Sequence, residues 1–169
     1  LATALFPVFS RYVGKEGLKD RLVLIYRKSF DVLFLAGASL AVVFFVFAPF
    51  VIAVIGGPSF SGSVPALRIL VFATFIAYFN HLTGYILIAL GKQKVSLVVA
   101  IIALIWNIGL NLILIPRYSY LAAAGVTIVT EGLVLILTSL YLAKNFQLKP
   151  SLTFPKTFVE IVKTKGKIF

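Results

Sequence analysis

Four long apolar runs, each bounded by charged or turn-forming residues, dominate the sequence. They cover about residues 32–55, 65–90, 95–115 and 120–143. A bilayer core about 30 Å thick needs roughly 20 apolar residues at a rise of 1.5 Å per residue, so each run can cross it as a helix. The first and third runs lack the period-two alternation of a membrane barrel strand. The pattern therefore predicts an all-α fold, a polytopic transmembrane helical bundle with four complete spans.

Lys and Arg are distributed unevenly between these runs. Basic residues are numerous before the first run, between the second and third, and after the fourth, but scarce in the other two connections. Because short cytoplasmic loops carry an excess of Lys and Arg, both ends of the bundle segment are predicted to lie in the cytoplasm. We expect the end of a preceding transmembrane helix at 1–10, a basic cytoplasmic loop at 11–31, the four-helix segment at 32–143 and a basic cytoplasmic connector at 144–169.

Composition supports a lipid environment. The chain is 61% apolar and 12% charged, whereas soluble domains are about 45–50% apolar and about 25% charged. The net charge of +11 comes from cations between apolar runs, so anionic membrane lipids are the expected partners and no nucleic acid is expected. No cysteine is present, and no residue pattern predicts a metal or cofactor. Because the chain starts at Leu1 and lacks Met, we expect a fragment of a multi-pass cell-membrane protein.

Two ionisable side chains fall near the middle of the predicted spans, Glu131 in the fourth and His81 in the second. A charge near the bilayer centre costs about 2.5–3.5 kcal/mol on insertion scales, so such groups usually face a cavity or each other. In the functional interpretation they pair across helices as a proton-relay or ion-coupling site. In the structural interpretation Glu131 is a protonated or hydrogen-bonded packing contact, and His81 with Asn80 caps a local helix contact.

Four further polar side chains are candidates for binding a substrate: Arg68, Asn80, Asn107 and Asn111. Asn107 and Asn111 are four residues apart, so they share one helix face and can hydrogen-bond a neighbouring helix. Helix packing is the alternative role for both. Arg68 lies about one turn inside the outer end of the second span. There it either snorkels to the headgroups and anchors the outer loop, or holds a phosphate through its guanidinium fork.

Familiar catalytic motifs are missing from the sequence. It has no phosphate-cradling glycine loop, GxSxG, HExxH or DxD, so no enzyme activity is predicted and transport is favoured. A membrane-embedded enzyme of envelope synthesis, the first alternative, would carry catalytic residues in a long outer loop, and the outer connections here are short. A purely structural membrane subunit is the second alternative, and it predicts that Glu131 and His81 can be replaced together without loss of function.

Several segments between residues 4 and 143 resemble one family of membrane exporters. In residues 107–116 two Asn four apart precede Ile-Pro, which resembles the Asn-x3-Asn-x3-Ile-Pro of the polysaccharide biosynthesis and export family. These proteins are lipid-linked oligosaccharide flippases of the multidrug/oligosaccharidyl-lipid/polysaccharide exporter superfamily. The chain has Ser119 and Ala122 where the family usually has glycine. Further similar segments are Ala4-Leu5-Phe6-Pro7 with Ser10-Arg11, residues 56–60 with Leu67-Arg68-Ile69-Leu70, and Ala89-Leu90-Gly91-Lys92-Gln93.

This resemblance implies two six-helix lobes around a cavity, with alternating access that carries a lipid-diphosphate-linked glycan outward. The present chain then represents most of the second lobe, and its partners are the lipid-linked glycan and the missing N-terminal lobe of the same protein. Inward-facing cations hold the diphosphate in this picture and ion coupling drives the cycle, with Arg68 and Glu131 as the respective candidates. A multidrug or cation antiporter of the same superfamily is the alternative, and it requires carboxylates rather than cations to dominate the cavity.

Overall fold

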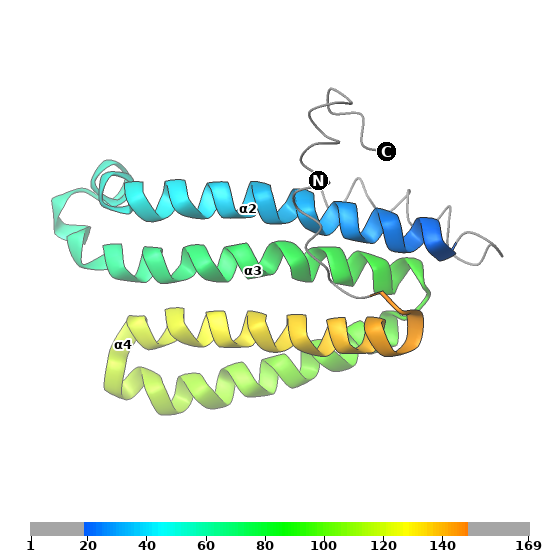
Figure 1. Ribbon diagram of the computed structural model, residues 1–169. Coiled ribbons are helices and arrows are strands. Elements are labelled where there is room, and N and C mark those ends of the chain that lie inside the picture. Colours follow the sequence, from blue (N-terminus) through cyan, green and yellow to red (C-terminus); the bar gives the residue numbers. More distant parts are fainter. Residues whose placement is uncertain (1–18, 149–169) are drawn as a thin grey trace, which may run out of the picture.

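The computed structural model describes residues 19–148, which form helices joined by short turns. Figure 1 shows these helices lying side by side along a common direction. The described part of the chain contains no strand, so the prediction of an all-α fold is confirmed. The elements in chain order are helix α2 (Lys19–Ile55), the short 3₁₀ helix η1 (Pro58–Ser63), helix α3 (Val64–Ala89) and helix α4 (Gln93–Phe146).

Helix α4 is a hairpin rather than one straight rod. Its backbone is helical except at Ser119, where φ is 55° and ψ is −146°. At this residue the chain reverses, so that a first arm (93–118) and a second arm (120–146) lie side by side (Figure 1). A hydrogen bond of 3.0 Å from Asn107 Nδ2 to Thr130 Oγ1 joins the two arms. A straight helix of 54 residues would instead be about 80 Å long.

The prediction of four separate spanning helices is not matched. Among residues 19–148, three helices are long and apolar enough to cross a membrane: Leu22–Ile55, Pro58–Ala89 and Gln93–Phe146. The predicted third and fourth spans both lie within α4, one in each arm. The physical reason is that the reversal is confined to the backbone of Ser119, so the helix continues almost without interruption through the turn that we predicted between residues 115 and 120.

Helix α2 begins earlier than the predicted first span. Residues 19–31, which we placed in a basic loop, are helical and run directly into the apolar stretch. Leu22 and Tyr26, four residues apart, are both buried against the rest of the bundle, and this packing extends the helix through the basic segment. The predicted helix end at 1–10 and the connector beyond residue 148 lie outside the described residues.

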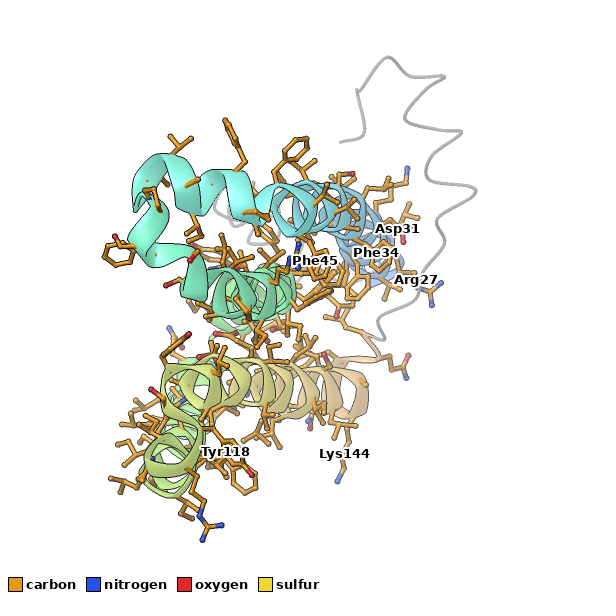
Figure 2. All side chains as sticks on the ribbon, turned by 90° about the vertical axis from the view of Figure 1, so that its left-hand side faces the viewer. Arg27, Asp31, Phe34, Phe45, Tyr118 and Lys144 are labelled. Carbon is orange, nitrogen blue, oxygen red and sulfur yellow. The ribbon has the colours of Figure 1, made fainter. Side chains whose placement is uncertain are left out.

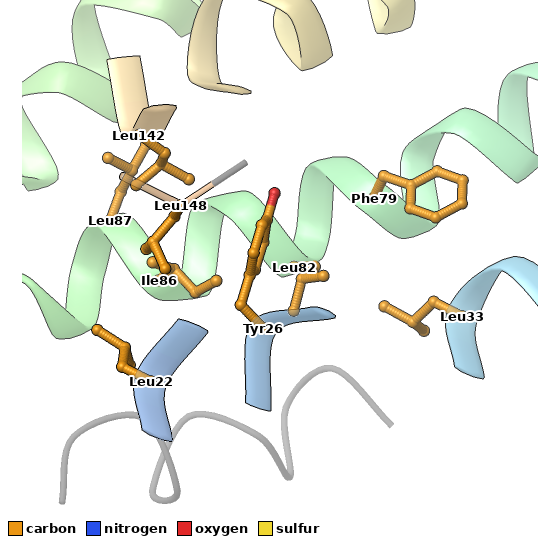
Figure 3. Packing of buried hydrophobic residues seen from close by; sticks show 9 residues of the cluster. All are labelled: Leu22, Tyr26, Leu33, Phe79, Leu82, Ile86, Leu87, Leu142 and Leu148. Carbon is orange, nitrogen blue, oxygen red and sulfur yellow. The ribbon is translucent and has the colours of Figure 1, made fainter. Parts of the chain in front are cut away.

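The hydrophobic core is concentrated at one end of the bundle, which we call the basic end because Lys92 and Lys144 lie there. The opposite end carries η1 and the turn at Ser119, and we call it the η1 end (Figure 1). Apolar side chains from α2, α3 and the second arm meet at the basic end, as Figure 3 shows. The buried cluster consists of Leu22, Tyr26, Leu33, Phe79, Leu82, Ile86, Leu87, Leu142 and Leu148.

Outside this core the bundle presents a largely apolar surface. Ile55 is 82% exposed and Leu112 is 72% exposed. Exposed apolar surface on this scale is typical of helices that contact lipid or another apolar helix. Figure 2, viewed from the η1 end, shows α3 between α2 and the arms of α4, so α3 has most of its neighbours inside this chain.

Candidate functional site

A pair of polar side chains lies between α3 and the second arm of α4. Asn80, in the middle of α3, donates a hydrogen bond from Nδ2 to Oε2 of Glu131 at 2.6 Å. The same nitrogen donates to the backbone carbonyl oxygen of Glu131 at 2.9 Å. An amide nitrogen carries two hydrogens, so Asn80 commits both of them to Glu131. Both side chains are half-buried, which places a carboxyl group inside an apolar bundle with a dedicated donor.

A second polar group joins the two arms of α4. Asn107 Nδ2 donates to Thr130 Oγ1 at 3.0 Å, and Asn111 Nδ2 donates to Asn107 Oδ1 at 2.9 Å. Asn107 and Asn111 therefore lie on one helix face, as their spacing predicts. Thr130 is the residue before Glu131 in the second arm. Because successive helix residues point about 100° apart, Thr130 faces the first arm while Glu131 faces α3.

A third polar contact fixes α3 against the second arm closer to the basic end. The hydroxyl oxygens of Thr138 and Thr83 lie 3.1 Å apart, within hydrogen-bond distance, and both residues are buried. We did not predict a contact for these two threonines or for Thr130 from the sequence. A hydroxyl in a helix usually bonds the carbonyl four residues earlier, as Thr130 and Thr138 also do. For this reason a threonine in an apolar run gives little sequence signal of a contact between helices.

His81 takes no part in these contacts. Its side chain is exposed on α3, and no hydrogen bond or ion pair joins it to Glu131 within residues 19–148. The partner of Glu131 is the preceding residue, Asn80. Since neighbouring helix positions diverge by about 100°, Asn80 and His81 cannot both face α4. The Glu131 and His81 pair that we considered is thus replaced by a Glu131 and Asn80 pair.

Arg68 lies apart from the polar contacts, near the η1 end of α3. Its Nε donates to the backbone carbonyl oxygen of Phe45 at 3.2 Å, and its guanidinium carbon is 5.1 Å from the centre of the Phe45 ring. Figure 2 shows Phe45 at the boundary between α2 and α3. The side chain therefore binds α2, a contact that the sequence did not predict. Of the six predicted site residues, the structure joins Asn80 to Glu131 and Asn107 to Asn111, and leaves Arg68 and His81 separate.

These polar contacts consist of a carboxyl group, amides and hydroxyls, and all of these groups form hydrogen bonds. A carboxylate accepts hydrogen bonds from an amide, and a protonated carboxyl group can instead donate to an amide oxygen. Asn80 Oδ1 and Asn111 Oδ1 are buried and have no partner among the described residues, so acceptor oxygens are present beside both polar groups. Residues 19–148 contain no group of three His, Cys, Asp or Glu side chains that could hold a metal ion.

Comparison with known proteins supplies the family. The sequence model of the MatE family matches residues 1–113 of the chain. An uncharacterized membrane protein of Methanocaldococcus jannaschii is 27% identical over 128 residues, which is 76% of this chain and 25% of that protein. The chain thus spans about a quarter of the length of this relative. No solved structure matches the chain.

These findings agree with the apolar helices of the bundle. The MatE match covers 113 of the 169 residues, well over half of the chain. The Methanocaldococcus jannaschii relative is a membrane protein, and three described helices can cross a membrane. The chain is that of a multi-pass membrane protein, and it belongs to the MatE family.

Proposed function

We propose that the protein containing this chain exports a lipid-linked oligosaccharide or polysaccharide precursor across the cell membrane by alternating access. The observation that carries the proposal is the carboxyl group of Glu131, held by Asn80 between apolar helices of an exporter-family protein. Proton or cation binding changes the charge of such a group and can couple transport to an ion gradient. The resemblance of residues 107–116 to lipid-linked oligosaccharide flippases supports the choice of substrate.

Four membrane crossings are part of this proposal. At 1.5 Å per residue each arm of α4 is about 39–40 Å long, which exceeds a bilayer core of about 30 Å. The hydroxyl of Tyr120 donates to the carbonyl oxygen of Gly62 at 2.8 Å, so the turn at Ser119 lies beside η1. The basic end carries Lys92 and Lys144, which supports a cytoplasmic position for that end. The two arms then count as separate crossings.

Replacing Glu131 with glutamine tests the coupling role. Glutamine retains a carbonyl oxygen that can accept from Asn80 but cannot change its charge. We expect Glu131→Gln to lower gradient-driven export by at least ~10-fold, the size of effect that follows from about 1.4 kcal/mol of lost coupling. Glu131→Asp keeps the charge with a shorter side chain and should retain part of the activity. Export at the wild-type rate by the Glu131→Gln variant of the full-length protein would contradict the coupling role of Glu131.

The same superfamily offers a second candidate, a multidrug or cation antiporter. The observation that favours it is that Glu131, a carboxyl group rather than a cation, occupies the polar contact inside the bundle. Membrane vesicles containing the natural-length protein can separate the two. We expect a polyprenyl-diphosphate-linked oligosaccharide to become accessible to a membrane-impermeant lectin, with no energy-dependent ethidium efflux. Ethidium efflux without glycan movement would select the antiporter. The absence of both activities would contradict both proposals.

A further inference from the structure

Pro49 creates a local defect in the hydrogen bonding of α2. It lies inside this helix, and proline has no backbone N–H with which to bond the carbonyl oxygen four residues earlier. That residue is Phe45. A backbone carbonyl oxygen without a partner is costly away from water, and most of all in hydrocarbon. The helix therefore needs another donor at Phe45.

Arg68 provides a donor at this position. Its Nε bonds the carbonyl oxygen of Phe45 at 3.2 Å from the neighbouring helix α3, and the guanidinium carbon is 5.1 Å from the centre of the Phe45 ring. The Phe45 ring also packs edge-on against Phe72 of α3, with ring centres 5.7 Å apart. The carbonyl oxygen of Phe45 has no helical donor because of Pro49. It accepts a hydrogen bond from Arg68 of α3 instead.

We propose that Arg68 is a positioning residue that completes the hydrogen bonding of α2 at Pro49 and thereby fastens the η1 end of α2 to α3. Residues 50–55 follow the weakened turn, so without this bond they can pivot about Pro49. A guanidinium group suits the task because it is always charged, donates in fixed directions and stacks on aromatic rings. Hydrogen bonds from a charged donor are also stronger than neutral ones.

A double-mutant cycle between positions 49 and 68 tests the proposal in the natural-length protein. We expect Arg68→Ala to lower the midpoint of thermal unfolding by roughly 5 °C and to raise amide hydrogen exchange in residues 46–55 several-fold. Pro49→Ala restores an N–H that can bond the carbonyl oxygen of Phe45. In the Pro49→Ala background, Arg68→Ala should therefore cause less than half of the midpoint shift and no local rise in exchange.

Rescue by Pro49→Ala separates this role from a general contribution of Arg68 to stability. Loss of ring stacking or of surface charge would be the same in both backgrounds, so equal effects of Arg68→Ala with and without Pro49→Ala would overturn the proposal. No effect in either background would overturn it as well. Arg117→Ala, which removes an exposed arginine of the first arm, is the matched control and should change neither measurement.

If Arg68→Ala does not fold, the double variant Pro49→Ala with Arg68→Ala is still expected to fold, since its Phe45 carbonyl oxygen has a helical partner again. A double variant that fails to fold while Pro49→Ala alone folds would overturn the proposal. Export measurements are not needed at any step, so failure of the transport proposal leaves this test unaffected.

Discussion

Replacing Ser119 with glycine should stabilise the protein, because the reversal of α4 imposes a strained backbone on this residue. Ser119 has φ of 55° and ψ of −146°. A positive φ brings the Cβ atom of an L-residue close to its own backbone, and with ψ near −150° the conformation is occupied almost entirely by glycine. The residue is exposed, and its hydroxyl makes no hydrogen bond within residues 19–148. No side-chain hydrogen bond within the described residues therefore offsets the strain.

The expected gain follows from two opposing effects. A residue held in such a sparsely populated region costs on the order of 1–3 kcal/mol, and glycine removes this cost. Glycine also gives the unfolded chain more freedom, which reduces the gain by about 0.5–1 kcal/mol. The free energy of unfolding should thus rise by about 1 kcal/mol in Ser119→Gly. For a chain of this size that raises the midpoint of thermal unfolding by roughly 2–4 °C.

Thermal unfolding of the purified protein in detergent, followed by far-ultraviolet circular dichroism, measures the effect. Two variants serve as controls. Ser119→Ala keeps the Cβ atom and should not raise the midpoint. Ser139→Gly makes the same replacement in the regular helix of the second arm, where it should lower stability by roughly 0.5 kcal/mol. A midpoint for Ser119→Gly at or below that of the unaltered protein would refute the reasoning.

Two further predictions concern contacts between elements. A Cβ atom added at Gly37 would lie 2.9 Å from Phe75 Cδ2 and 3.1 Å from Tyr78 Cδ2, so Gly37→Ala should lower the free energy of unfolding by about 1–2 kcal/mol in denaturant titrations. Gly84→Ala, at a helical position with nothing within 4 Å, should not lower it. Tyr120→Phe removes the bond to the Gly62 carbonyl oxygen and should raise proteolysis of the η1 loop, with a stability loss of about 0.5–1 kcal/mol. An unchanged cleavage rate would contradict the second prediction.

Hydropathy predicted the helical parts of the fold well, because the length of an apolar run reflects the thickness of the medium that it crosses. The first run was expected to end at residue 55, where α2 ends, and the second to begin at residue 65, one residue inside α3. Hydropathy could not predict how the chain reverses between the third and fourth runs. That reversal depends on two backbone angles of Ser119. The sequence pointed to it only in that Ser119 stands where the resembled family usually has glycine.

The polar contacts were predicted in part, and the failures share one cause. Spacing along one helix is fixed by helix geometry, so Asn107 and Asn111 were correctly expected on one face. The rotation of α3 about its axis is fixed by packing against its neighbours, which the sequence does not specify. His81 was therefore considered as the partner of Glu131, whereas Asn80 holds that place.

Helix α3 is the element through which the described polar contacts fasten the bundle. Arg68 binds it to α2 near the η1 end, Asn80 binds it to Glu131 halfway along, and Thr83 binds it to Thr138 towards the basic end. The first arm of α4 is instead bound to the second arm, through Asn107 and Thr130. A change in the charge of Glu131 thus acts first on the contact between α3 and the second arm. Because Thr130 and Glu131 are consecutive, any rotation of the second arm that releases Asn80 also alters the bond to Asn107.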